Sequence, residues 1–191
     1  MDFLYKKYPK GTYEYADYKK KIDIVVMIVF FALAIGLYIT GYVSTGSNRN
    51  LLTIVAVLGL LPACKMVVDV VMCFRVKKCS PATKEKIDAA VGKLTGMYNM
   101  YFTSYDKNYS IDHLVVTENS IIGLSLDSGF DEKEFQAHLN DLLRKDGIKD
   151  IMIKIFNKDD KYIARLEELN ALEDADKTNS GVLSLIYNVT I

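Results

Sequence analysis

The sequence predicts an α/β (α+β) protein in which an N-terminal transmembrane helical hairpin precedes a small mixed-sheet domain. Two apolar stretches follow one another near the start of the chain, at residues 24–43 and 51–74. A polar turn of seven residues, 44–50, separates them. From residue 80 onward, short runs of alternating apolar residues are interspersed with segments of helical periodicity. That pattern is typical of a mixed sheet flanked by helices.

Both apolar stretches are long enough to cross a bilayer, whose hydrocarbon core is about 30 Å thick and needs roughly 20 helical residues. The first stretch has no charged residue, and the second carries only Lys65 and Asp69. The short polar turn predicts that the two helices pack as an antiparallel hairpin. The lipid bilayer is therefore the first expected partner, and a homo-oligomer formed through the hairpin is the second.

We divide the chain into three parts: a tyrosine- and lysine-rich interfacial arm at 1–21, the two-helix hairpin at 22–74, and an α/β domain at 80–191. The 191 residues leave room for one small globular core. The formal net charge is zero, so no global field points to nucleic acid as a partner. The three cysteines form neither a disulfide framework nor a paired metal motif, and we expect reduced thiols and no cofactor.

The charges that flank the hairpin predict its sidedness. Lysine and arginine gather before the first apolar stretch and after the second, whereas the turn holds only Arg49. Positive flanks stay in the cytoplasm, so we expect a multi-pass protein of the cell membrane with both termini cytoplasmic. Tyrosine rings favour the headgroup zone. The expected membrane-interface anchors are Tyr13, Tyr15, Tyr18, Lys19, Lys20, Lys21, Arg75, Lys77 and Lys78.

Two alternatives stay open for this flank. The arm can instead be a peptide-like segment that docks on the cytoplasmic domain or on a partner. The lysines can form a dedicated site for anionic lipid rather than a simple stop-transfer flank.

Lys65 and Asp69 form a candidate intramembrane polar pair, because residues four apart share one face of a helix. Such residues are costly inside a span unless they are paired, hydrated or packed inward. Three interpretations stay open. The two residues lie near the cytoplasmic interface, they make a buried contact that fixes an oligomer, or they line an ion or proton path built by several copies.

The cytoplasmic domain is expected to have the order α-β-β-β-α-β-α-β. Its helices are expected to begin at Ser80-Pro81, at Asp131 and at Asp159 or Asp160, the last one running to about residue 175. Its strands are expected at residues 97–105, 111–117, 120–126, 151–156 and 183–191. His113 and His138 have no metal-ligand or triad partner at a suitable spacing, and we interpret them as structural or surface residues.

The order α-β-β-β-α-β resembles the core of the PD-(D/E)xK restriction-endonuclease-like fold. Residues 111–116 (IDHLVV), followed by a turn and residues 121–124 (IIGL), resemble a stretch of the nuclease-related (NERD) domains, in which an aspartate opens the second core strand. The resemblance covers residues 81–156. It implies carboxylates that hold a divalent metal, which activates water, with a lysine nearby. The catalytic candidates that it implies are Asp112, Asp127 and Glu85.

The chain departs from that family at the point where its chemistry resides. The next strand, residues 121–127 (IIGLSLD), lacks the acid-x-lysine motif, so we expect a domain without catalysis. The whole chain also resembles a group of bacterial two-span proteins of unassigned function with a label of the type "O-linked GlcNAc transferase-like". Nothing in the chain supports glycosyl transfer, because it has no repeat of 34 residues and no room for a nucleotide-sugar domain.

These observations favour an integral membrane protein that presents a small non-catalytic α/β domain at the cytoplasmic membrane surface. Its expected role is interaction or assembly with an unidentified cytoplasmic protein, not with nucleic acid. One alternative is a membrane-tethered nuclease-like hydrolase that uses Asp112. A second alternative is a subunit of an oligomeric small transporter or channel that uses Lys65 and Asp69.

Overall fold

The computed structural model describes residues 7–104, 107–172 and 177–190, and the chain divides into two compact units. The hairpin unit contains residues 16–75 together with the start of the chain. The sheet domain contains Val76–Ile191 together with Pro9–Tyr15. We call Pro9–Tyr15 the strap. The sheet domain therefore includes a segment that precedes the hairpin, which the sequence analysis had assigned to the interfacial arm.

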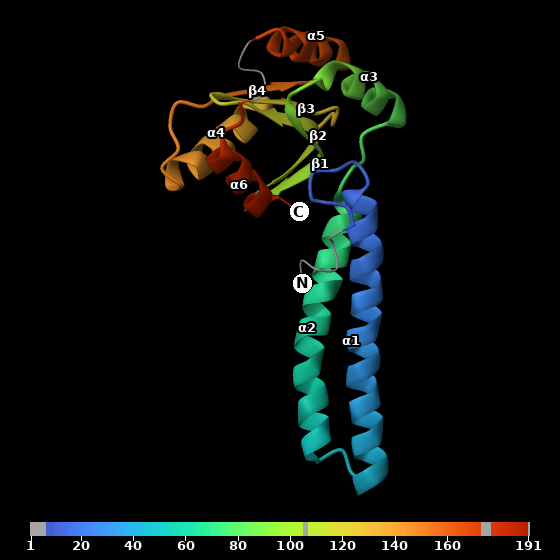
Figure 1. Cartoon of the computed structure of the whole chain (residues 1–191). Helices are drawn as coiled ribbons and strands as arrows, with labels where there is room; N and C mark the ends of the chain where they lie inside the picture. Colours follow the sequence, from blue (N-terminus) through green and yellow to red (C-terminus); the bar gives the residue numbers. More distant parts are fainter. Residues whose placement is uncertain (1–6, 105–106, 173–176, 191) are drawn as a thin grey trace. The chain divides into compact units, whose positions relative to one another are not determined.

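Two long helices form the hairpin unit: α1 (Tyr15–Thr45) and α2 (Leu51–Arg75). They run antiparallel and side by side (Figure 1). At 1.5 Å per residue their 31 and 25 residues span about 46 and 38 Å, so both exceed the hydrocarbon core of a bilayer. The turn is closed by Asn50, whose Oδ1 accepts a hydrogen bond from the Thr53 amide at 2.8 Å. The expected helical hairpin is confirmed.

The sheet domain contains a mixed sheet of four strands. They are β1 (Thr95–Thr103), β2 (Asn108–Val116), β3 (Ser120–Leu124) and β4 (Met152–Phe156). The strands lie in sequence order across the sheet. The pairs β1–β2 and β2–β3 are antiparallel, and the pair β3–β4 is parallel. The crossover between β3 and β4 passes through α4 (Glu132–Lys145), as parallel neighbours require.

Helices cover both faces of this sheet (Figure 1). On one face, α4 and α6 (Ser180–Val189) pack through Phe135, Leu139 and Ile186. On the other face, α3 (Pro81–Val91) and α5 (Asp159–Asn170) bury their apolar sides. The result is an α+β domain with an apolar core on each side of one sheet.

Two of the three expected helix starts are confirmed by their caps. The Ser80 side chain accepts the Thr83 amide proton at the start of α3, and Asp131 accepts from two amides at the start of α4. The start of α5 differs. Its N-cap residue is Lys158, which makes no side-chain cap bond, and Asp159 lies inside the first turn. The helix also ends at Asn170, before the expected residue 175.

The expected final strand at residues 183–191 is wrong, because this segment forms helix α6 as far as Val189. Its apolar residues fit both periods, since 182, 185 and 186 lie on one helical face just as 183, 185 and 187 alternate. The Asn179 side chain decides between the two by accepting hydrogen bonds from the amides of Gly181 and Val182. Ile191 lies outside the described residues, as does Tyr105 at the end of an expected strand.

In both β1 and β2, the alternation of core-facing residues shifts by one residue, and the two shifts lie opposite each other in the sheet. Met97 and Met100 are three residues apart yet face the same core. Ile111 and Leu114 do the same on β2. The shift falls at Asn99 and Asp112, which lie between the pairs Tyr98–His113 and Met100–Ile111 of the ladder. Asn99 has the left-handed φ of 54°. A polar residue on each strand therefore leaves the regular pattern at this point.

Candidate functional site

A polar depression in the sheet domain brings together two of the three acids that the sequence singled out. Its volume is about 320 Å³. Its lining consists of Lys77, Lys78, Ser80, Ser110, Asp112, Leu126, Asp127 and Ser128. Glu85 is absent from this lining and lies on α3. Asp112 and Asp127 therefore lie together, whereas Glu85 does not join them.

Asp112 lies at the shifted point of β2, where its side chain is only 9% exposed. Its Oδ2 accepts a hydrogen bond from the Leu126 amide at 2.7 Å. Burial raises the pKa of this carboxyl above its ordinary value, and the nearby Asp127 charge adds to that rise. The Leu126 hydrogen bond and Lys77 oppose the rise.

Asp127 has the opposite environment, although it lines the same depression. Its Oδ1 pairs with the Lys77 ammonium at 2.8 Å, and this pair lowers the pKa of the Asp127 carboxyl. The Lys77 side chain is 63% exposed, so the ion pair is solvated and contributes little to stability. The depression thus places one carboxyl of raised pKa beside one of lowered pKa, a pattern that acid–base sites use.

The depression offers few carboxylates, and this limits the ligands that it could bind. Among the described residues, no group of three or more His, Cys, Asp or Glu side chains could hold a metal ion. A cation at this position would have two protein carboxylates and serine hydroxyls as ligands, and one carboxylate already pairs with Lys77. A metal ion here would therefore need water or substrate oxygens to complete its coordination.

A second polar cluster surrounds a buried histidine on the face of the sheet that α3 and α5 cover. His113 is fully buried, and its Nδ1 lies 2.6 Å from the Tyr162 hydroxyl. Tyr162 is also fully buried, and its hydroxyl forms this hydrogen bond with His113. The direction of this hydrogen bond depends on which imidazole nitrogen carries the proton. The Nε2 atom lies against Gly96, and the structure gives it no hydrogen-bond partner.

Burial keeps this imidazole neutral. It lowers the pKa of His113 to about 3, and the Asp88 charge opposes the shift only in part. The Tyr98 ring lies 4.4 Å from the imidazole, and its hydroxyl donates to Asp88 Oδ1 at 2.6 Å. Asp88 also pairs with Lys84 at the surface. The expectation that His113 is a structural residue agrees with this environment.

The strap docks against the same cluster. Gly11 accepts a backbone hydrogen bond from the Tyr98 amide at 2.7 Å, and the Tyr13 ring packs edge-on against Tyr98 at 5.7 Å. The Tyr13 hydroxyl donates to the Cys79 carbonyl at 2.8 Å. Asn99 joins both sides: its Nδ2 donates to the Tyr13 carbonyl at 3.0 Å, and its Oδ1 accepts from the Cys79 amide at 2.8 Å.

Sequence reasoning missed the roles of Asn99 and Gly11. The signals were a polar residue inside an apolar run, Tyr98-Asn99-Met100, and a glycine directly after Pro9-Lys10. Both residues have a positive φ, 54° for Asn99 and 90° for Gly11. The docked strap corresponds to the alternative in which the arm binds the domain.

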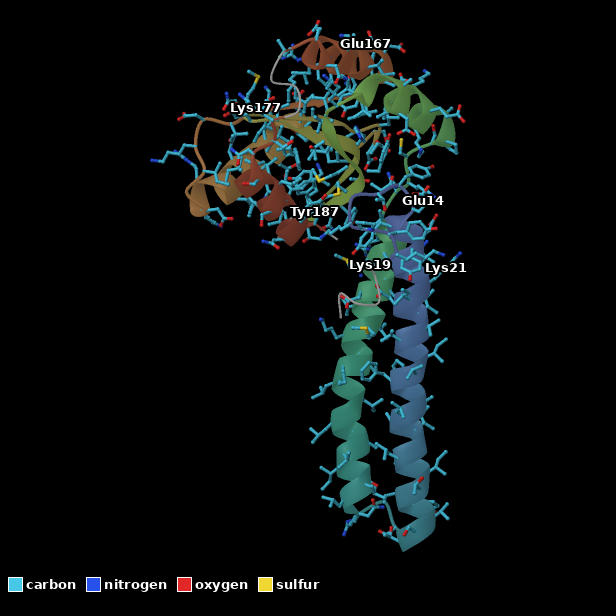
Figure 2. The ribbon with its side chains drawn as sticks, viewed as in Figure 1. Glu14, Lys19, Lys21, Glu167, Lys177 and Tyr187 are labelled. Carbon is cyan, nitrogen blue, oxygen red and sulfur yellow. The ribbon has the colours of Figure 1, made fainter. Side chains whose placement is uncertain are left out.

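The candidate interface anchors divide between the two units. Tyr18, Lys19, Lys20, Lys21 and Arg75 belong to the hairpin unit, whereas Tyr13, Tyr15, Lys77 and Lys78 belong to the sheet domain. Figure 2 shows Lys19 and Lys21 near the same end of α1. The Lys20 ammonium lies 4.4 Å from the centre of the Phe74 ring, and that of Lys78 lies 4.3 Å from the Tyr13 ring. Their role at a membrane surface stays a prediction.

Inside the hairpin, the structure gives no ion pair between Lys65 and Asp69, both of which are described residues. Lys65 is exposed and Asp69 is half-buried. The buried charge lies elsewhere: Asp23 is 1% exposed, pairs with Lys19 at 2.6 Å, and accepts a hydrogen bond from the Cys73 thiol at 3.5 Å. The sequence signal for this contact was a carboxylate four residues after a lysine, directly before the first apolar stretch.

The close approach of the two helices depends on Gly41. A Cβ built there would lie 2.6 Å from Asn50 Oδ1 and 2.9 Å from Leu52 Cβ, so any larger residue would push the helices apart. Ala34 is also buried, whereas Gly36 has nothing within 4 Å. Of these small residues, Ala34 and Gly41 are those that the hairpin buries within itself.

Comparisons of the chain with profiles of known protein families, with curated proteins and with solved structures found no match. These comparisons therefore lend no support to the resemblance to nuclease-related domains or to that with bacterial two-span proteins. The functional argument consequently depends on the chain's own geometry.

Proposed function

We propose that the protein is a two-span membrane protein whose hairpin holds the sheet domain at the cytoplasmic membrane surface for interaction or assembly. The observation that carries this proposal is the apolar exposure of both long helices. In the most apolar part of each helix, only 11% of the α1 residues and 17% of the α2 residues are buried. A core helix of a water-soluble protein would be mostly buried, and apolar patches of this extent mark contact with lipid or with a partner.

Charge distribution and the strap support one orientation. The basic residues flank the hairpin on both sides, whereas the turn carries Arg49 alone, which favours cytoplasmic flanks. The sheet domain itself contains residues from before α1 and from after α2. Both flanks then lie on the side of the membrane where the domain folds.

The test is the behaviour of the full chain in membranes. We expect it to stay with the membrane fraction after alkaline carbonate extraction and to enter solution only with detergent. Leu33→Lys in α1 and Leu58→Lys in α2, both exposed apolar positions, should reduce membrane retention because a charge at mid-span is costly. Lys149→Glu, an exposed change in the sheet domain, is the matched control. A monodisperse, detergent-free monomer would contradict the proposal.

A second candidate, a membrane-tethered hydrolase of phosphodiesters, is favoured by one observation. Asp112 and Asp127 share a depression with Lys77, and carboxylates with a lysine are the groups that metal-assisted hydrolysis uses. The test is Mg²⁺- or Mn²⁺-dependent cleavage of nucleic acid by the full chain in nanodiscs. Activity that Asp112→Asn abolishes, and that Glu85→Gln leaves unchanged, would establish the hydrolase. A lack of cleavage both with and without added metal would exclude the hydrolase.

A further inference from the structure

We infer that the strap is a structural part of the sheet domain, so that the domain is completed only when both flanks of the hairpin lie on the same side of the membrane. The inference rests on the proposed function for its membrane part, and on contacts within the sheet domain for its docking part. It assigns to Pro9–Tyr15 a coupling role between insertion of the hairpin and completion of the fold.

The first argument is the position of β1 at an edge of the sheet. Strand order leaves one side of β1 without a neighbouring strand. An open edge of this kind exposes unpaired backbone groups and invites pairing with another chain. Here the Tyr98 amide donates to the Gly11 carbonyl, and Phe102 forms an isolated antiparallel bridge with Thr190. The strap and the residue after α6 together cover the edge.

The second argument is that one hydrogen-bonded network joins the two flanks. Tyr13 precedes α1 and Cys79 follows α2, yet the Tyr13 hydroxyl donates to the Cys79 carbonyl. Asn99 binds both through its amide group and fixes them to β1. Each of these buried or half-buried polar groups is satisfied by the others, so removal of the strap would leave Asn99 and Cys79 with unmet hydrogen bonds.

The third argument is the fit of Lys10 and Gly11. The Lys10 ammonium donates to the carbonyls of Tyr187 and Thr190, where a cation stabilises the C-terminal end of α6. Gly11 has a φ of 90°, and a Cβ there would lie 3.0 Å from Met97 Cγ and 3.3 Å from the Tyr187 hydroxyl. The strap thus occupies a place that accepts glycine and little else.

These contacts have a topological consequence. α1 begins at Tyr15, the last residue of the strap, and the sheet domain resumes at Val76, directly after α2. A chain whose first helix entered the membrane with its start on the opposite face would place the strap out of reach of β1. The edge, the Asn99 network and the end of α6 would all be left open in that case.

The first experiment measures docking by hydrogen–deuterium exchange of the full chain in nanodiscs. We expect Gly11→Ala to speed exchange of the Tyr98 amide about tenfold, because strap docking protects it. Gly129→Ala, where the added Cβ meets nothing within 4 Å, is the matched control. Tyr13→Phe keeps the ring and removes only the hydroxyl, with Tyr18→Phe as its control, and should speed exchange near Cys79. Unchanged Tyr98 exchange in Gly11→Ala would overturn the inference.

The second experiment measures sidedness in sealed proteoliposomes. Single cysteines replace the exposed Lys7 and Lys93 in a chain whose native cysteines are alanine, and an impermeant maleimide labels them from outside. Equal labelling of both positions supports the inference, and labelling from opposite faces overturns it. If the chain proves soluble, the proposed function fails while the exchange result still decides whether the strap docks.

Discussion

At the scale of single residues, the sheet domain depends on a neutral imidazole in an apolar layer. His113 makes one hydrogen bond, to the Tyr162 hydroxyl, and its second nitrogen faces Gly96. A buried polar ring with one satisfied atom is costly to charge. The consequences concern the dependence of folding on pH and the space beside the ring.

Folding stability should decrease as pH falls below about 6.5, with His113 as one cause. The unfolded imidazole binds a proton near its ordinary pKa of 6.5, whereas the folded one does so only at about 3. Between these values the unfolded state binds more protons, so acid lowers the free energy of unfolding by up to about 1.4 kcal/mol per pH unit. Chemical denaturation between pH 7 and pH 4 measures this slope. His113→Phe should flatten it relative to wild type.

Gly96→Ala should destabilise the sheet domain. A Cβ at this position would lie 2.5 Å from His113 Nε2 and 3.2 Å from Val91 Cγ2. The imidazole is held by Tyr162 and cannot move freely, so we expect a loss of about 1–3 kcal/mol, as for other overpacked cores. The midpoint of denaturation provides the measurement. A loss no larger than that of Gly129→Ala would show that the ring can shift.

Among the site residues, the sequence could identify single polar groups but not their convergence. Asp112 lies in the middle of β2 and Asp127 lies three residues after β3, and the antiparallel pairing of His113 with Leu124 brings the two acids together. Glu85 has an equally acidic side chain, but its place on α3 depends on helix packing that no local pattern records. Asn99 was missed because a left-handed residue inside a strand has no reliable signature.

At the scale of elements, the caps explain where sequence reasoning succeeded and where it failed. Ser80 and Asp131 are strong N-caps, and the helices begin where they predict. The segment after Asn179 is apolar at so many positions that strand and helix periods both fit. Its apolar face then packs on the sheet through Val182 and Ile186, a contact that the local sequence pattern does not show.

Asn179→Ala should therefore weaken α6. The Asn179 Oδ1 accepts hydrogen bonds from the Gly181 and Val182 amides at 3.1 Å, and its Nδ2 donates to the Glu118 carbonyl. Loss of an N-cap of this type costs about 1 kcal/mol. Thermal unfolding of the full chain in detergent would report the change. Asn188→Ala, near the other end of the same helix, is the control and should have a smaller effect.

At the scale of the whole molecule, the sequence predicted the two long apolar helices and the mixed sheet. The helices follow from long uninterrupted apolar stretches, and the sheet follows from short apolar runs separated by turn signals. It could not predict that the strap belongs to the sheet domain. The contact between Lys10 and Tyr187 joins residues 177 positions apart, and neither residue has a local pattern that points to the other.

If the hairpin serves only to anchor the domain, the double variant Lys65→Leu and Asp69→Leu should keep its membrane insertion and the fold of its sheet domain. Lys65 is exposed and makes no ion pair with Asp69 within the described hairpin, so its removal breaks no visible contact. Carbonate extraction and thermal unfolding should match wild type. Asp23→Leu, which removes the partner of Lys19 and Cys73, should instead lower hairpin stability. Loss of ion flux in the first variant would favour the transporter interpretation.

The contact of Lys10 with the end of α6 also imposes an order on biosynthesis. Lys10 leaves the ribosome early, but its acceptors at Tyr187 and Thr190 emerge only after the hairpin and all four strands have been made. During that interval the part of the β1 edge that Thr190 bridges at Phe102 stays open. Slow elongation would lengthen this exposure, and chaperones that shield open strands would then be most needed just before synthesis reaches residue 187.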